Sequence, residues 1–190
     1  MRENINAAET GVGIHGLKGN IRAVILQSAE QARHYKKQRR RQDDLVIPIG
    51  PEAMYQTERH GWATCNLSEL WSSEDYERSR GESQLRIDRA IDAINAHSME
   101  WNPDLGLEMG NYYAFQLWLV LGQIHYNYFV VSSMARNLKP IGVLAYTKDI
   151  GQSFRELRPD PDCIAVEVLL HSGCFNPEQI EIQRISEKRK

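Results

Sequence analysis

The sequence predicts a mainly α-helical protein with a short β-ribbon near its N-terminus. Side chains alternate between polar and apolar over residues 18–25, a helix-capping signal follows, and later segments repeat apolar residues at three-to-four spacing. With 190 residues, of which 42% are hydrophobic and 25% charged, the chain is long enough for one sizeable core. We expect a flexible leader at 1–15, a ribbon and basic helix at 16–50, and a helical core and dimerisation domain at 51–190.

The predicted strand over 18–25 has two different faces. One face carries Gly19, Ile21, Ala23 and Ile25, and the other carries Lys18, Asn20, Arg22 and Val24. Such a strand suits a two-stranded ribbon in the major groove of DNA, because the apolar row stays on a core while the polar row reaches base edges. A single strand cannot make a ribbon, so the pattern predicts a homodimer. Ile21, Ala23 and Ile25 would then hold the ribbon, and Lys18, Asn20 and Arg22 would read bases.

A basic helix is predicted directly after this strand. Ser28 and Gln31 have the spacing of a capping box, which places the start of the helix at about Ala29. Between Lys18 and Arg41 there are eight basic residues against the single acid Glu30, a local charge of about +7 in a chain whose net charge is −2. The residues predicted to hold phosphates are Arg33, Lys36, Lys37, Arg39, Arg40 and Arg41. The alternative is a solvated helix whose last basic residues only complement the helix dipole.

The proline-containing segment 45–51 is the predicted domain boundary, since proline removes a backbone donor and restricts the residue before it. After it we expect an irregular helix at 66–80, an amphipathic helix at 84–101, an apolar helix at 112–138, a short helix at 147–157, a strand at 164–170 and a last helix that begins at Asn176 and Pro177. The apolar helix nears the length of a membrane span, but Gln116, Gln123, His125 and Asn127 interrupt it. We therefore expect its aromatic residues in the core or in a dimer interface, and no membrane association.

Residues typical of catalytic and metal sites lack the spacing that such sites need. Cys65, Cys163 and Cys174 form no CxxC pair, and the six histidines form no HExxH pair. GVGIHG at 11–16 matches G-x-G-x-x-G, but a polar leader precedes it instead of a strand. The odd cysteine count and the absence of an apolar run after Arg2 favour a reducing cytoplasm. The sequence thus predicts no enzyme activity, no cofactor and no metal.

Four stretches of the chain carry a resemblance to a known family. They are IRAVILQSAEQARHYKK, RIDRAIDAI, NYYAFQLWLVLGQIHYNYFVV and KDIGQSFREL, and the region that they span, 21–157, covers about two-thirds of the chain. Their order resembles the AcaB-type transcriptional regulators of conjugative plasmids and integrating conjugative elements. The resemblance implies a ribbon-helix-helix-like DNA-binding module, a homodimer, and activation of conjugative transfer genes in the bacterial cytoplasm, associated with the nucleoid or a plasmid and with RNA polymerase as a further partner. The segment 45–51 departs from this pattern, because a ribbon-helix-helix follows its first helix closely with a second.

These observations lead to one main functional hypothesis and two alternatives. The main hypothesis is a dimeric, sequence-specific regulator that binds double-stranded DNA with its ribbon in the major groove. The first alternative is an accessory protein of a mobile element that binds nucleic acid, single strands in particular, without sequence preference. The second alternative is a protein-interaction module whose basic helix docks an acidic partner.

Overall fold

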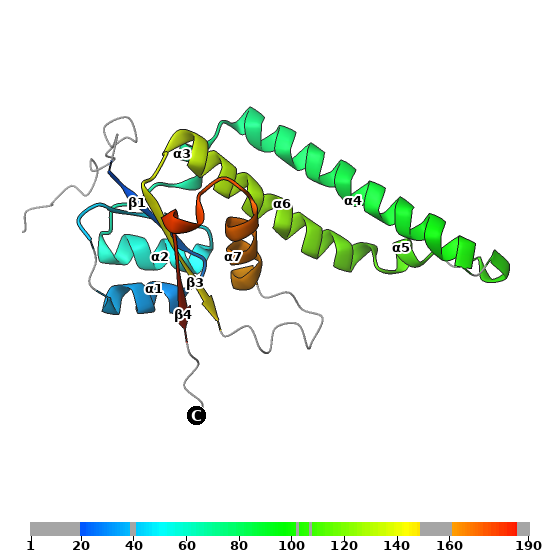
Figure 1. Cartoon of the computed structure of the whole chain (residues 1–190), viewed down its shortest axis with the longest axis horizontal. Helices are drawn as coiled ribbons and strands as arrows, with labels where there is room; N and C mark the ends of the chain where they lie inside the picture. Colours follow the sequence, from blue (N-terminus) through cyan, green and yellow to red (C-terminus); the bar gives the residue numbers. More distant parts are fainter. Residues whose placement is uncertain (1–19, 39–40, 102, 107, 149–160, 186–190) are drawn as a thin grey trace, which may run out of the picture.

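The computed structural model describes residues 20–38, 41–101, 103–106, 108–148 and 161–185. It is mostly helical, and its described strands form one parallel sheet in the order β2-β1-β3-β4 (Figure 1). The strands are β1 (Arg22–Leu26), β2 (Asp44–Pro48), β3 (Gly142–Lys148) and β4 (Ile180–Ile185). The α-helices are α1 (Ala29–Lys37), α2 (Pro51–His60), α3 (Leu67–Leu70), α4 (Ser73–Trp101), α5 (Met109–Tyr112), α6 (Ala114–Asn137) and α7 (Pro161–His171). Two 3₁₀ helices complete the described elements: η2 (Pro103–Leu105) lies between α4 and α5, and η3 (Pro177–Gln179) lies between α7 and β4.

The strand that was predicted to form a ribbon is instead a central strand of the sheet. β1 pairs in parallel with β2 on one side and with β3 on the other, so both of its edges already have partners. All five residues of β1 are buried, which is typical of a parallel strand covered on both faces. The predicted antiparallel ribbon and the dimer built on it are therefore wrong, because β1 offers no free edge to a second copy.

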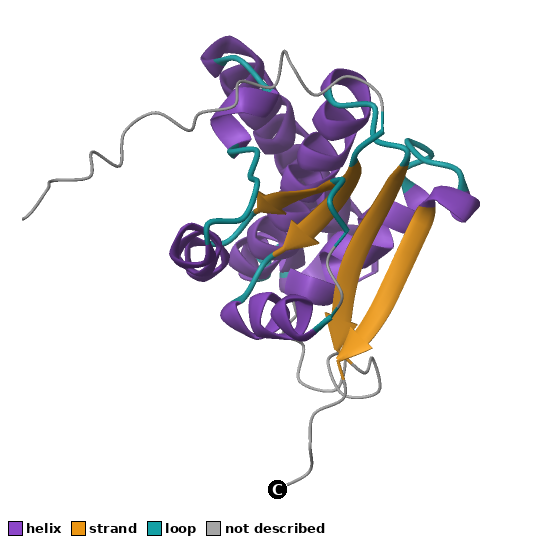
Figure 2. Ribbon diagram, turned by 90° about the vertical axis from the view of Figure 1, so that its left-hand side faces the viewer, coloured by secondary structure: helices purple, strands orange, loops and turns teal. Residues whose placement is uncertain are grey.

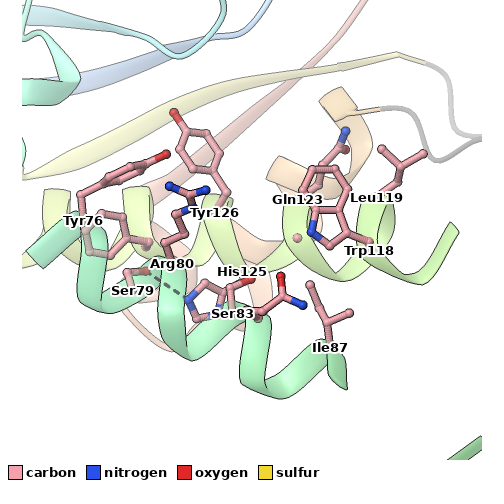
Figure 3. Close-up of a pocket in the computed structure, with 13 residues that line it drawn as sticks. Tyr76, Ser79, Arg80, Ser83, Ile87, Trp118, Leu119, Gln123, His125 and Tyr126 are labelled. Carbon is pink, nitrogen blue, oxygen red and sulfur yellow. Dashed lines mark hydrogen bonds between the residues drawn. The ribbon is translucent and has the colours of Figure 1, made fainter. Parts of the chain in front are cut away.

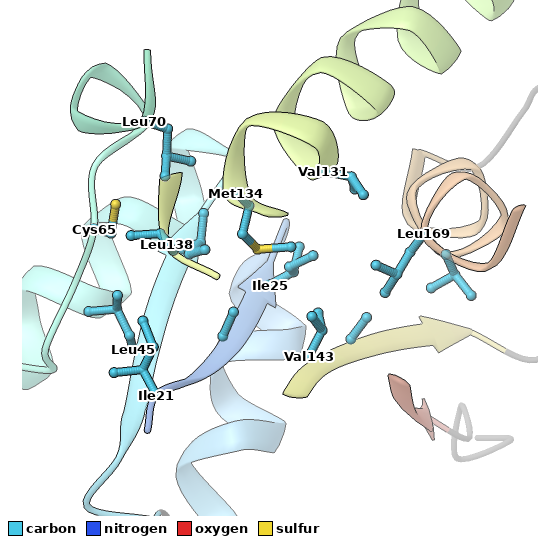
Figure 4. Close-up of a cluster of buried hydrophobic side chains, with 14 residues drawn as sticks. Ile21, Ile25, Leu45, Cys65, Leu70, Val131, Met134, Leu138, Val143 and Leu169 are labelled. Atoms are coloured by element: carbon cyan, nitrogen blue, oxygen red, sulfur yellow. The ribbon is translucent and has the colours of Figure 1, made fainter. Parts of the chain in front are cut away.

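Two layers of helices cover the sheet (Figures 1 and 2). On one face, α1 and α2 pack over a buried cluster that includes Val24, Tyr35 and Tyr146. On the other face, α3, α6 and α7 enclose a second cluster. Figure 4 shows this second cluster, to which Ile21, Ala23 and Ile25 contribute side chains that are at most 8% exposed. The three residues predicted to hold a dimer ribbon thus belong to the core of a single chain.

The sheet joins segments from both sides of the predicted domain boundary. β1 and β2 precede residue 50, whereas β3 and β4 follow it by about 90 residues or more. Between them, α4 and α6 form a long helical arm that extends away from the sheet (Figure 1). The predicted DNA-binding module at 16–50 and the helical core at 51–190 therefore share one sheet.

Several predicted elements differ from the observed ones near the C-terminus. Residues 164–170, predicted as a strand, lie in α7, because a short uninterrupted apolar run fits a buried helix as well as a buried strand. Asn176 and Pro177 do begin a helical turn with a capping box, but the turn is the 3₁₀ helix η3 and β4 follows it at once. The predicted helix at 147–157 is wrong at its start, which belongs to β3, and residues 149–157 lie outside the described part.

The helices of the arm agree better with the sequence. The predicted helix at 84–101 is the second part of α4, and the predicted helix at 112–138 corresponds to the end of α5 followed by α6. Within the described residues, no helix combines the length and the apolar character that crossing a membrane would require.

Two described cysteines differ in exposure and should differ in reactivity. Burial raises the pKa of Cys65 to about 12, and the nearby Glu69 adds to this shift. Cys174 is only partly buried. Because the thiolate is the reactive form, we expect iodoacetamide to label Cys174 in the native protein at least about tenfold faster than Cys65. Mass spectrometry of timed samples measures this ratio, and equal rates would show that Cys65 is accessible.

Candidate functional site

The exposed side of α1 is the basic surface that the sequence predicted. Gln31, Ala32 and Tyr35 are buried against the sheet, whereas Arg33, Lys36 and Lys37 are exposed. Arg41, which follows the helix, is exposed as well. We call these four residues, Arg33, Lys36, Lys37 and Arg41, the α1 basic surface. None of them forms an ion pair with another described residue.

A buried carboxylate holds the chain where this basic surface ends. Asp44, the first residue of β2, accepts hydrogen bonds from Nε and Nη2 of Arg22 at 2.7 and 3.0 Å. It also accepts one from the Tyr35 hydroxyl at 3.0 Å and one from the backbone N–H of Arg41 at 3.1 Å. Asp44 thereby ties the last turn of α1 and the start of β2 to the central strand.

The charges in this cluster stabilise one another. Burial raises the pKa of Asp44, but hydrogen bonds from Arg22, the Arg41 backbone and Tyr35 outweigh it, so the pKa lies below its ordinary value. The hydrogen bond to Asp44 raises the pKa of Arg22 despite the opposing effect of burial. Glu181, whose side chain is 45% exposed, accepts a further bond from Arg22 at 2.9 Å. Both central groups therefore stay ionised at neutral pH.

The base-reading residues predicted from the sequence do not form a common surface. Arg22 is 8% exposed and its guanidinium is bound by Asp44 and Glu181, so it is not available to bases. The prediction that Arg22 reads DNA is therefore wrong, because β1 is a central strand and its first residue is buried. Asn20 is exposed, just before the strand. Lys18, Arg39 and Arg40 lie outside the described residues, as does GVGIHG.

The strand order places a topological switch point between β1 and β3, where open α/β sheets usually bind ligands beyond the carboxyl ends of the strands. Here the side chain of Gln31 bridges these strands: it accepts from the Gln27 N–H at 2.8 Å and donates to the Tyr146 carbonyl at 3.3 Å. Glu52 accepts from the N–H of Ala29 at 3.3 Å, in the first turn of α1. A carboxylate thus occupies the place where a nucleotide phosphate would bind a helix N-terminus.

The arm carries a pocket of about 450 Å³ between α4 and α6 (Figure 3). Ser79 Oγ and His125 Nε2 lie 3.1 Å apart across it and hydrogen-bond the two helices to each other. Burial, with a smaller effect of Tyr76, raises the pKa of Tyr126, another lining residue. The side-chain oxygen of Gln123 is buried without a hydrogen-bond partner among the described residues. The aromatic walls and these polar groups suit a small organic molecule with a hydrogen-bond donor.

The sequence did not indicate Asp44 or the Ser79–His125 pair as site residues. A pairing of Arg22 with Asp44 depends on the parallel register of β1 and β2, in which these two residues are opposite each other. The useful signal was the apolar run that follows each of them, AVIL after Arg22 and LVIP after Asp44, which is typical of buried parallel strands. Ser79 and His125 come from helices whose pairing no local pattern specifies.

No group of histidine, cysteine and acidic side chains within the described ranges has an arrangement that would hold a metal ion. Comparison with known proteins found no matching family model, no matching curated protein and no matching solved structure. The function has to be inferred from the site itself.

Proposed function

We propose that this protein binds double-stranded DNA through the phosphate backbone, with the α1 basic surface as its contact. The observation that carries the proposal is the division of α1 into a buried face and an exposed cationic face. The proposal keeps the DNA partner expected from the sequence and replaces readout by a ribbon with contact by a helix.

The fold supports this proposal because it anchors the helix that carries the cations. Tyr35 anchors α1 to the sheet, and its hydroxyl binds Asp44, which also binds the backbone of Arg41. Cations on an anchored helix lose less conformational freedom on binding than the same cations on a flexible tail. The alternative role for basic residues in the last turn is to complement the helix dipole, which would stabilise the helix by only about 0.3–1 kcal/mol per residue.

Charge segregation supports the same partner. Without Arg22, which is paired with Asp44 and Glu181, the segment from Lys18 to Arg41 carries about +6, whereas the whole chain has a net charge of −2. Duplex DNA carries more phosphate charge per unit length than a single strand, so a local cationic surface should bind the duplex with higher affinity. Binding should therefore be tighter to duplex, strongly dependent on salt and nearly independent of sequence.

Fluorescence anisotropy with a labelled 30-base-pair duplex of random sequence, and with one of its strands, tests the proposal. If the four cations each neutralise one phosphate, log K against log salt should have a slope of about −3.6, which is about a 150-fold loss between 50 and 200 mM KCl. The double variant Lys36→Glu/Lys37→Glu should bind at least about tenfold more weakly at 50 mM KCl and show a slope of about −1.8.

The matched control is Arg86→Glu/Arg89→Glu on α4, which changes the net charge equally at two exposed positions of the arm. This control should bind like the wild type, apart from a small general effect of charge. The proposal is abandoned if the wild type shows no binding at 50 mM KCl, or if both double variants lose affinity to the same extent.

A further inference from the structure

Helix α6 has an uncharged surface that the rest of the described chain leaves partly uncovered. From Ala114 to Ala135 it contains no Asp, Glu, Lys or Arg. A largely apolar helix without charged residues is normally buried on most of its sides. Yet Phe115 is 67% exposed, Trp118 51%, Ile124 40% and Tyr128 44%. The neighbouring α4, by contrast, carries charges of both signs on its exposed side.

One row of this surface has the spacing of a helix–helix contact. Leu117, Leu121, Ile124 and Tyr128 follow one another at intervals of four, three and four residues, which places them on one side of α6. Ile124 and Tyr128 are exposed, and Leu117 and Leu121 are partly exposed. We call these four residues the α6 seam. The same row continues at Val131, which is buried in the core beside the sheet, so the seam is the part of this row that precedes the core residues of α6.

We infer that the α6 seam is a homodimer interface, in which α6 packs antiparallel against α6 of a second copy around a two-fold axis. The spacing four-three-four reads the same in both directions, so an antiparallel copy places Leu121 opposite Ile124 and Leu117 opposite Tyr128. A two-fold interface requires a surface that is complementary to itself. An uncharged seam meets this requirement, because no charge is brought against its own copy.

The dimensions of the arm fit such an interface. At 1.5 Å per residue, the 24 residues of α6 extend about 36 Å and the 29 residues of α4 about 44 Å. Two such arms side by side form a bundle of four helices. A length of this order is enough for the roughly 800 Å² that each partner buries in a standard interface.

Analytical ultracentrifugation of the full chain at 5–100 µM tests the inference. We expect a species of twice the chain mass that persists in 0.5 M NaCl, because apolar contacts are not screened by salt. The variant Leu121→Glu/Ile124→Glu should sediment as a monomer with an unchanged circular dichroism spectrum, and its dimer dissociation constant should rise at least about 100-fold. If that variant does not fold, Tyr128→Arg at the end of the seam gives the same test.

The matched control is Met54→Glu/Tyr55→Glu, which charges two exposed apolar residues of α2 and should leave the dimer intact. A wild type that is monomeric at 100 µM overturns the inference, as does a dimer that the seam variants do not weaken. Open-ended assembly instead of a closed dimer overturns it too. None of these results depends on DNA binding, since both double variants at the seam and on α2 leave the α1 basic surface unchanged.

Discussion

Replacing Arg22 by Met is expected to destabilise the protein by about 3–5 kcal/mol, the range measured when one partner of a buried ion pair is removed. The Asp44 side chain is 1% exposed, so its charge has no access to water once the guanidinium is gone. The hydrogen bonds from Tyr35 and the Arg41 backbone remain but compensate only part of the lost interaction. Urea unfolding at pH 7, followed by circular dichroism, measures the change.

The pH dependence of this effect has a definite sign. In the wild type the pKa of Asp44 is lowered, so its contribution to stability is complete above the ordinary value of 3.8 and is lost as the pH falls through the folded-state pKa. In Arg22→Met, burial dominates and raises the pKa of Asp44, so acid relieves the penalty by protonating the carboxyl. The stability curves of wild type and variant should therefore converge as the pH is lowered toward 4.

Glu181→Gln serves as the control for Arg22→Met, because the Glu181 side chain is 45% exposed and forms only one bond to Arg22. Its cost should stay within about 1 kcal/mol, as for other exposed ion pairs. Equal losses in Glu181→Gln and Arg22→Met would contradict the central role of Asp44.

The substitution Gly50→Ala should destabilise the protein by about 3 kcal/mol, at the upper end of the usual cost of overpacking. A Cβ atom at Gly50 would lie 2.1 Å from the carbonyl oxygen of Gln27. The oxygen is a backbone atom and a Cβ is fixed rigidly to its own backbone, so a side-chain rotation cannot relieve the clash. The adjacent N–H of Ile49 donates to the Leu26 carbonyl at 2.8 Å, so the chain after β1 and the chain after β2 cannot move apart without breaking the end of the sheet. Thermal unfolding should show a loss of several degrees in melting temperature.

The comparison is Gly81→Ala, in the interior of α4, where no atom lies within 4 Å of the added Cβ. Alanine is the better helix former there, and a gain of about 0.5–1 kcal/mol is expected. If both substitutions destabilise the protein by the same amount, the absence of a side chain at Gly50 is not required by its close approach to Gln27.

Local patterns in the sequence located α1, α4 and α6, but they did not indicate α2 and they predicted a strand in place of α7. The capping signal at Ser28 placed the start of α1 correctly, since the Ser28 side chain accepts from the N–H of Gln31. The buried and exposed faces of α1 also followed from its spacing. These features depend on residues three or four apart, for which local physics is sufficient.

The sheet could not be predicted in the same way, because its pairing involves residues far apart. Alternation along 18–25 suggested a half-buried strand. Within β1, however, side chains on both faces are buried, because β2 and β3 place this strand inside the sheet. The role assigned to Arg22 failed for the same reason: a polar residue at the start of a strand is a plausible DNA contact until a carboxylate is found opposite it. The exposure of Arg33, Lys36 and Lys37 was predicted correctly because it depends only on the helix, whereas their contact with phosphates stays a prediction.

The parallel sheet also constrains how the chain acquires its structure during synthesis. β1 needs β3 as a neighbour, with Arg22 opposite Gly142, so the central strand emerges from the ribosome long before its second partner exists. At about 5–20 residues per second, those 120 residues take roughly 6–24 s to make. During that time one edge of β1 has no partner strand. Four of its five residues are apolar, and an apolar strand edge of this kind aggregates or recruits a chaperone. The nascent N-terminal third is therefore the part of this protein most in need of protection.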